Sequence, residues 1–524
     1  MRALSYHSAA ERLLATVGPG EGDHSFRKRP VVVEVVAFAA YVLVFAFALR
    51  LLNPILLRYD DAWFMLVSYS WLNGLSFTNH WVDPISSGVY NWHGFLQPLL
   101  LASLAPCGSF TCLNLVLVAL GLVWLALWFV AVNLCTNHVL LRCALYVIGV
   151  GSVLQYSARP ELLASLALLC ILVVYVRCAG SPRYWIRAGL TGGLLGVVAV
   201  TSPAAAVLVC VGAAAVVGYL WRDSRNVTSF VLEGALVAGS SILSAILLLL
   251  AAYPLEAAVW IEGMREHAQV NADRSDTTGF LRYYLATKMY PLQGVMFMPL
   301  AALALWTGVA VWKGGNRMLF VAFFLSSAAF CYFLYYSAIR IPAAFYNFSF
   351  LVPVISLLAV AVARCNARSH VRGALVVPVF VFALACGAAQ VFWAAQKVYS
   401  APERQELTQG ISRAVDDGLA AGVSIAMDPP LAVAIDDAQK LKQIDLLFFG
   451  RPGKRPQEPL RVQLLLRAQT ELGTLPDEVP GFRLVEEAFL DSPLVAFVKP
   501  EGLYYAVYEA EPAVTGADSR AGQL

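Results

Sequence analysis

The sequence predicts a polytopic α-helical membrane protein of about 11 transmembrane helices, followed by a small α/β domain on the extracytoplasmic side. Three observations support this prediction. Hydrophobic residues make up 59% of the 524-residue chain and charged residues only 14%, and the mean hydropathy is +0.67. Apolar stretches long enough to cross about 30 Å of hydrocarbon recur between residues 31 and 394. The composition then becomes charged and proline-rich over 395–524.

These stretches divide the chain into a mostly polar N-terminal tail (1–30), a transmembrane module (31–394) and a C-terminal domain (395–524). The first span shows no small-residue cleavage site, so we interpret it as a retained helix rather than a signal peptide. The predicted spans are 31–52, 111–133, 139–156, 160–178, 186–201, 203–220, 229–252, 291–312, 318–337, 343–363 and 373–394.

Basic residues alternate between the two sides of these spans, as the positive-inside rule requires. The short outward loops hold only Arg159 and Arg340, whereas most other lysines and arginines of the module fall at the opposite ends of the spans. This pattern predicts a cytoplasmic N-terminus and an extracytoplasmic C-terminal domain, in the inner (plasma) membrane of a bacterium. The net charge of +3 and the absence of a basic-aromatic patch argue against a nucleic-acid partner.

Two outward segments, about 53–110 and 253–290, are too long to be plain connections. Within the first, 62–75 and 94–105 are apolar but too short to cross the bilayer, so we expect them in its interface. In the C-terminal domain, the alternation of residues predicts a helix and several short strands, at 403–421 and at 423–427, 445–449, 483–485 and 504–508.

Cysteine usage points to one site on the outer side. Only Cys107 and Cys112 lie there, where a disulfide can persist, and we predict that they are disulfide-bonded. Two buried thiols are the alternative. The other eight cysteines fall within spans or at their inner ends and show no metal-ligand spacing.

Asp60 and Asp61 follow the first span and are the most informative residues of the chain. Two adjacent carboxylates are costly to bury and repel each other, so an acidic pair at the membrane is a functional hypothesis. One carboxylate could take a proton from a hydroxyl while its neighbour orients it, raises its pKa or holds a cation. The alternative is a pair of acids that hydrates a loop. The same outward loop offers aromatic and imidazole groups for substrate binding, at Trp63, His80, Tyr90 and His93.

Two further sites lie on the same predicted outer face. Arg159-Pro160-Glu161 opens the fourth span, where Glu161 either complements the helix dipole or supplies a third carboxylate, with Arg159 beside it for phosphate. Arg340 stands in an apolar outer turn, where it either snorkels to ordinary headgroups or grips a lipid phosphate. His80 and His93 are likewise either interface residues whose hydrogen bonds are made within the protein, or residues that bind substrate.

The layout of the chain resembles the GT-C superfamily of polyprenyl-phosphate-sugar glycosyltransferases. The shared features are one N-terminal span, an outward loop with an acidic pair, interfacial helices, and Arg-Pro-Glu at the start of the fourth span. Within this superfamily, the protein O-mannosyltransferase and lipid A aminoarabinose transferase branch is the most similar in layout. The resemblance covers roughly 25–365 and implies that Asp60 is the general base, with Asp61 beside it and Glu161 as a further site acid. That branch usually has Asp-Glu where this chain has Asp-Asp.

The resemblance implies transfer of a sugar from a polyprenyl-phosphate donor to an envelope glycan, lipid or protein on the outer face, with inversion. It leaves open whether a divalent cation takes part, with Asp61 and Glu161 as candidate ligands. Two other classes stay open: a flippase for lipid-linked sugars, which would place acids inside the spans, and a polysaccharide polymerase or ligase, which would use segment 253–290. The expected partners are the donor, the acceptor and membrane lipid.

Overall fold

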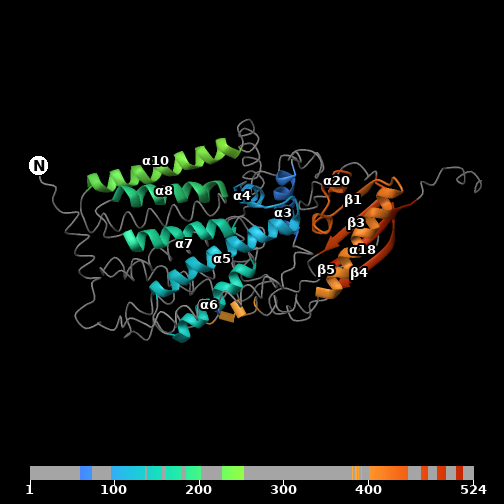
Figure 1. The fold of residues 1–524 in the computed structure, drawn as a ribbon, viewed down its shortest axis with the longest axis horizontal. Helices are drawn as coiled ribbons and strands as arrows, with labels where there is room; N and C mark the ends of the chain where they lie inside the picture. The colour runs from blue at the N-terminus through green and yellow to red at the C-terminus, as the bar shows by residue number, and fades with distance from the viewer. Residues whose placement is uncertain are drawn as a thin grey trace, which may run out of the picture. The chain divides into compact units, whose positions relative to one another are not determined.

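The computed structural model describes residues 40, 59–73, 96–135, 139–155, 161–178, 184–201, 227–252, 381, 384–385, 387–388, 391, 401–446, 462–469, 479, 481–490 and 503–511. These residues are mostly helical, with one five-stranded sheet near the C-terminus (Figure 1). The chain divides into two compact units. The first holds the apolar helices, and the second holds residues 59–73, residues 107–111 and the C-terminal sheet. The predicted domain boundaries near residues 30 and 394 lie outside the described residues.

The first unit consists of apolar helices, all of which coincide with predicted spans except the first, which coincides with the predicted interfacial segment 94–105. They are α4 (Leu96–Leu104), α5 (Phe110–Cys135), α6 (Val139–Gln155), α7 (Glu161–Cys178), α8 (Tyr184–Thr201) and α10 (Val227–Ala252). Among the described residues, two segments are long and apolar enough to cross a membrane: Phe110–Asn133 and Val231–Ala251, with mean hydropathies of 2.8 and 2.2. The full number of spans stays a prediction, because several of them, such as 291–312, lie outside the described residues.

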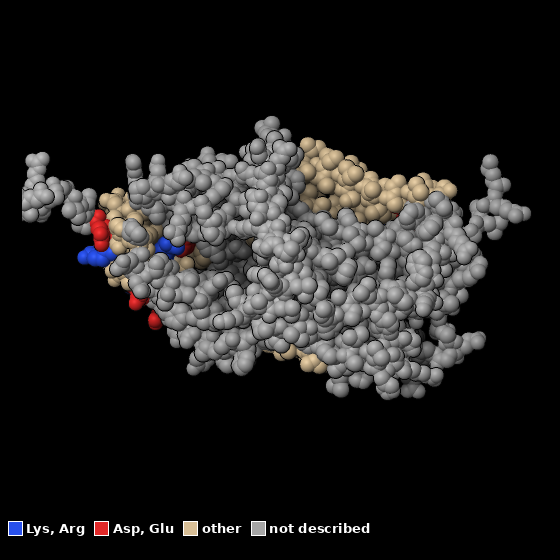
Figure 2. All heavy atoms as spheres, turned by 180° about the vertical axis from the view of Figure 1, so that it is seen from behind, with Lys and Arg blue, Asp and Glu red and all other residues tan. Residues whose placement is uncertain are grey.

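Helix α10 presents an apolar surface. Only 6% of its Val231–Ala251 segment is buried. Its exposed side chains include Val231, Leu232, Leu236, Ile242, Leu243, Ile246, Leu247 and Leu250. The described surface in this part of the molecule carries no basic or acidic spheres in the view from behind (Figure 2). A continuous apolar face of this size is typical of a helix that meets lipid or another apolar partner.

Helices α8 and α10 lie side by side and approach closely at small residues (Figure 1). A Cβ atom placed on Gly196 would lie 2.8 Å from Cβ of Ser244, so only glycine fits there. The Ser244 hydroxyl donates to the carbonyl of Gly193 at 3.1 Å. Small residues of this kind bring helix backbones together in membranes, where no hydrophobic driving force separates helix from lipid.

A buried ion pair joins the same two helices. The Arg187 guanidinium donates from Nε and Nη2 to Oε1 of Glu233, at 2.9 and 2.5 Å, and both side chains are almost inaccessible. A charge in such surroundings needs a partner. The pair therefore fixes the register of α8 against α10.

The second unit contains a mixed sheet with strand order β2-β1-β3-β5-β4. Strand β1 pairs in parallel with both β2 and β3, whereas β5 is antiparallel to β3 and β4. The strands are β1 (Ile425–Met427), β2 (Ile444–Leu446), β3 (Leu464–Gln469), β4 (Phe482–Leu490) and β5 (Leu503–Ala510). All four predicted strands overlap an observed one, and β3 is the strand that the sequence did not reveal.

Helix α18 (Ala401–Ala420) lies along one face of this sheet, close to the predicted helix 403–421 (Figure 1). Gly418 lets it approach, because a Cβ atom there would already lie 3.0 Å from the side chain of Ile425. Two residues beyond the last residue of the helix, Gly422 has φ +70°, and the Val423 amide donates to the Gly418 carbonyl at 2.9 Å. This is the left-handed ending that favours glycine. Two four-residue helices, α19 (Pro429–Ala432) and α20 (Ala438–Leu441), complete the described part of the domain.

Candidate functional site

The predicted acidic pair lies at the start of helix α3 (Tyr59–Leu72). Asp60 and Asp61 are its second and third residues, in the first turn, where acidic residues complement the positive end of the helix dipole. Asn73 directly follows the helix, and its amide N–H and side-chain Nδ2 both donate to the Tyr69 carbonyl at 3.0 Å. At 14 residues α3 is about 21 Å long, too short to cross the hydrocarbon of a bilayer.

Most of α3 is buried, although the sequence predicts only an interfacial helix. Phe64, Met65 and Tyr69 are 3%, 0% and 1% exposed, and the two serines of the helix are buried as well. Ser68 meets its hydrogen-bonding need within the helix, by donating to the Phe64 carbonyl at 2.8 Å. Helix α3 packs against α19, all four residues of which are buried. It is thus a core element of the unit that contains the C-terminal sheet.

A second contact holds the end of α3 at residues 107–111. The ring of Tyr69 stacks on the ring of Phe110, and Asn73 Nδ2 donates to the Gly108 carbonyl at 3.3 Å. The Phe110 amide in turn donates to Oδ1 of Asp436 at 2.9 Å. Burial, followed by the negative charges of Asp436 and Asp437, raises the pKa of Tyr69 to about 12. Tyr69 is therefore a neutral phenol at any physiological pH.

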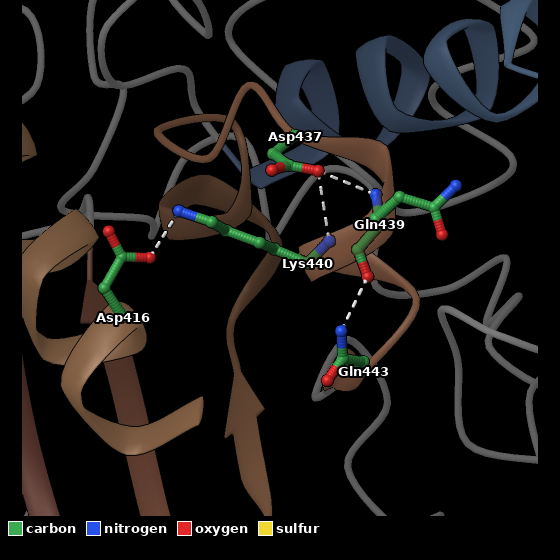
Figure 3. A network of polar contacts seen from close by, with 5 residues as sticks. All are labelled: Asp416, Asp437, Gln439, Lys440 and Gln443. Carbon is green, nitrogen blue, oxygen red and sulfur yellow. Dashed lines mark hydrogen bonds and ion pairs between the residues drawn. The ribbon is translucent and has the colours of Figure 1, made fainter. Parts of the chain in front are cut away.

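The turn that carries Asp436 is held by a small polar network (Figure 3). The Asp437 carboxylate caps α20 by accepting from the amides of Gln439 and Lys440, at 2.8 and 3.2 Å. Lys440 Nζ pairs with Asp416 of α18 at 2.5 Å, and this hydrogen bond raises the pKa of the lysine. The ion pair is exposed and contributes little to stability by itself. An N-cap carboxylate of this kind typically contributes about 1 kcal/mol.

Asp428 connects β1 to α19 and is the most deeply buried acid of the described domain. Its Oδ2 accepts from Arg467 Nε at 3.0 Å and from the Ala468 amide at 2.8 Å. Its Oδ1 accepts no hydrogen bond from the described part of the chain. Burial raises the pKa of this carboxyl, against the lowering effect of Arg467. The pair joins the end of β1, the start of α19 and strand β3.

The remaining predicted site residues are described in part or not at all. Glu161 is the first residue of α7, as expected from Pro160 before it, and belongs to the other compact unit. Trp63 lies in α3 beside the acidic pair. For Asp60, Asp61, Trp63 and Glu161 the structure describes the backbone only. Five predicted substrate contacts lie outside the described residues: Arg159, Arg340, His80, His93 and Tyr90.

The structure adds residues that the sequence did not single out: Phe110, Asp428, Asp436 and Asp437. Only Asp437 carries a recognisable signal, as an acid directly before a short helix. The predicted disulfide is confirmed, because Cys107 and Cys112 are both disulfide-bonded. No three potential metal ligands cluster among the described side chains, which exclude those of Asp61 and Glu161. The divalent cation stays a prediction.

Comparison of the chain with models of protein families, with curated proteins and with solved structures found no match. The chemistry of the site is therefore argued from its own residues. Two adjacent acids in the first turn of a short, buried helix can accept a proton or bind a cation.

Proposed function

We propose that this protein is a membrane glycosyltransferase that moves a sugar from a polyprenyl-phosphate donor to an envelope glycan, lipid or protein. The observation that carries the proposal is the place of Asp60 and Asp61, in the first turn of a helix too short to span and packed within a folded unit. A hydrating loop would need no such support. The helix dipole favours the ionised carboxylate, which is the form that a general base requires.

In the proposed reaction, the acceptor oxygen attacks the anomeric carbon of the donor sugar. The bond from that carbon to the phosphate oxygen breaks, polyprenyl phosphate leaves, and the acceptor proton passes to Asp60. Asp61 orients or tunes its neighbour, and Glu161 contributes a third acid. Arg159 and Arg340 neutralise the charge that develops on the leaving phosphate. One displacement inverts the configuration at the sugar carbon.

The proposed topology has about eleven spans, with the N-terminus in the cytoplasm and the acidic pair and sheet domain outside. The disulfide-bonded state of Cys107 and Cys112 supports this placement, because disulfides persist in oxidising compartments. Residues 107–111 belong to the same compact unit as α3 and the sheet, so one side of the membrane serves all three. A reporter fused after Tyr399 tests the proposal: we expect it outside, and a cytoplasmic signal would overturn the odd number of spans.

The catalytic assignment is tested with purified protein and synthetic polyprenyl phosphates, each carrying one radiolabelled hexose or pentose. Envelope extract from a strain that lacks the protein serves as acceptor. Asp60→Asn keeps the shape of the side chain but removes the proton acceptor, so turnover should fall about 10²- to 10⁴-fold while donor binding persists. Asp61→Asn should slow transfer less if it orients its neighbour, and equally if the pair holds a cation.

Asp417→Asn is the matched control, because it makes the same chemical change at an exposed position of α18. It should transfer sugar at the wild-type rate. The proposal fails if Asp60→Asn and the control are equally active. A transporter would be indicated if lipid-linked sugar still crosses vesicle membranes when both acids are replaced and no sugar is ever transferred.

A further inference from the structure

The C-terminal domain supports α3, the acid-pair helix, through α19. The two prolines that open α19 fix their backbone φ angles, and the whole of this short helix is buried. Asp428 directly precedes it and is bonded to the side chain of Arg467 and to the backbone of Ala468. The surface against which α3 packs is therefore itself fixed to the sheet.

A second contact reaches the far end of the acid-pair helix through Phe110. Phe110 is the first residue of α5, so its helix supplies no carbonyl four residues earlier for its amide. Asp436 satisfies it with a charged acceptor at 2.9 Å. The Phe110 ring then stacks on Tyr69, with centroids 4.1 Å apart. One exposed carboxylate thus fixes the ring on which α3 rests.

The position of Asp436 is determined by its neighbours rather than by its own burial. Asp437 caps α20, and Lys440 ties α20 to Asp416 of α18 (Figure 3). These contacts hold the turn between α19 and α20 at its α20 end, and at its α19 end the Ala434 and Ile435 amides donate to the carbonyls of Leu431 and Ala432 at 3.0 Å. Asp436 is exposed, so replacing it leaves no buried cavity.

We infer that the C-terminal domain positions the acid-pair helix and that Asp436 is the positioning residue through which it does so. The inference rests on the function proposed above. Tyr69 and Asp60 stand nine residues apart on one helix, about 13 Å along its axis, so a displacement at Tyr69 moves Asp60 as well. Misplacement of a reacting group by about 1 Å can slow catalysis on the order of 100-fold.

The test compares Asp436→Ala, Asp436→Asn and the control Asp417→Ala in the full-length protein. Transfer is measured with the radiolabelled polyprenyl-phosphate sugar that the wild-type protein uses, and kcat and KM are separated. Hydrogen exchange of peptides covering 59–73 and 107–112 is followed by mass spectrometry on the same samples. Asp436→Asn keeps an acceptor oxygen in the same place, and Asp436→Ala removes it.

We expect Asp436→Ala to lower kcat by about 10- to 100-fold with KM for the donor unchanged. Exchange in both peptides should quicken on the order of tenfold, as for loss of a charge-assisted hydrogen bond. Asp436→Asn should restore most of the activity and the slow exchange, and Asp417→Ala should match wild type in both. A wild-type kcat in Asp436→Ala would overturn the inference, whether or not exchange is faster. So would a variant that is only less stable to heat, with kcat per folded molecule unchanged.

The variant Asp60→Asn separates this inference from the function on which it rests. If Asp60→Asn is inactive and Asp436→Ala is fully active, the positioning role fails and the proposed function stands. If Asp60→Asn transfers sugar at the wild-type rate, both fail.

Discussion

Tyr69 of α3 and Phe110, the first residue of α5, stack face to face with ring centroids 4.1 Å apart and planes inclined by 13°. Both rings are buried, at 1% and 3% exposure. The stack joins the acid-pair helix to the short segment between two cysteines that are disulfide-bonded.

Replacing Phe110 with leucine should destabilise the unit that contains α3. The variant keeps an apolar side chain but loses the ring contact, which is worth about 0.5–1.5 kcal/mol beyond the buried area. Denaturant unfolding of the detergent-solubilised protein measures the change. Phe129→Leu is a matched control, because Phe129 stacks on Tyr146 within the other unit. Hydrogen exchange in α3 should quicken in Phe110→Leu only. Equally fast exchange in Phe110→Leu and in the control would contradict this account.

Alkaline pH should loosen the contact at Tyr69. The folded pKa is raised from 10.0 to about 12, so the neutral phenol is stabilised in the native state. This stability is fully present below pH 10, and it is lost as the pH rises through the folded pKa of about 12. Unfolding measured between these values should therefore depend less steeply on pH in Tyr69→Phe than in wild type. Identical pH dependence in the two proteins would show that the phenol is not coupled to folding.

The pair of Asp428 and Arg467 should be costly to break. Asp428→Ala leaves a half-buried guanidinium without this partner, and loss of one member of a buried pair typically costs about 3–5 kcal/mol. Adding Arg467→Met should recover part of the loss, so the double variant is more stable than Asp428→Ala. The four proteins of this cycle are compared by denaturant unfolding. Additive effects of the two substitutions would mean that the pair is not coupled.

The close approach of α8 and α10 can be tested by adding one methyl group to α8 with a glycine-to-alanine substitution. Gly196→Ala places a Cβ atom 2.8 Å from Cβ of Ser244, and overpacking of this kind costs about 1–3 kcal/mol. Gly189→Ala is the matched control, since a Cβ atom there meets nothing within 4 Å. Thermal unfolding in detergent should show a lower midpoint for the first variant only. Equal midpoints would mean that the helices can separate without cost.

Hydrophobic pattern predicted most of the described helices because their apolar runs are long. The short apolar segments 62–75 and 94–105 are also helical, at α3 and α4. Strand β3 escaped prediction for a physical reason. Its residues, Leu464-Leu465-Leu466-Arg467-Ala468-Gln469, do not alternate between apolar and polar, and leucine, arginine, alanine and glutamine equally suit a helix.

The support of the site could not be predicted, because it depends on contacts between distant residues. Asp436 and Phe110 are 326 positions apart, and nothing in Ile435-Asp436-Asp437 announces a partner in another segment. The acidic pair itself is recognisable from its cost near a membrane. The packing of α3 on α19 is instead a consequence of tertiary structure that local patterns do not encode.

The distance along the chain between Phe110 and Asp436 also determines how long after α3 its packing partner is synthesised. At roughly 5–20 residues per second, a ribosome needs about 16–65 s to synthesise the 326 residues that separate them. During that time the apolar surface of α3 has been made but its partner α19 has not. A message truncated before residue 429 would therefore yield a chain that inserts its spans yet never assembles the acid-pair helix. We expect the unit that contains α3 to stay unfolded in such a product, because α3 then has no α19 to pack against.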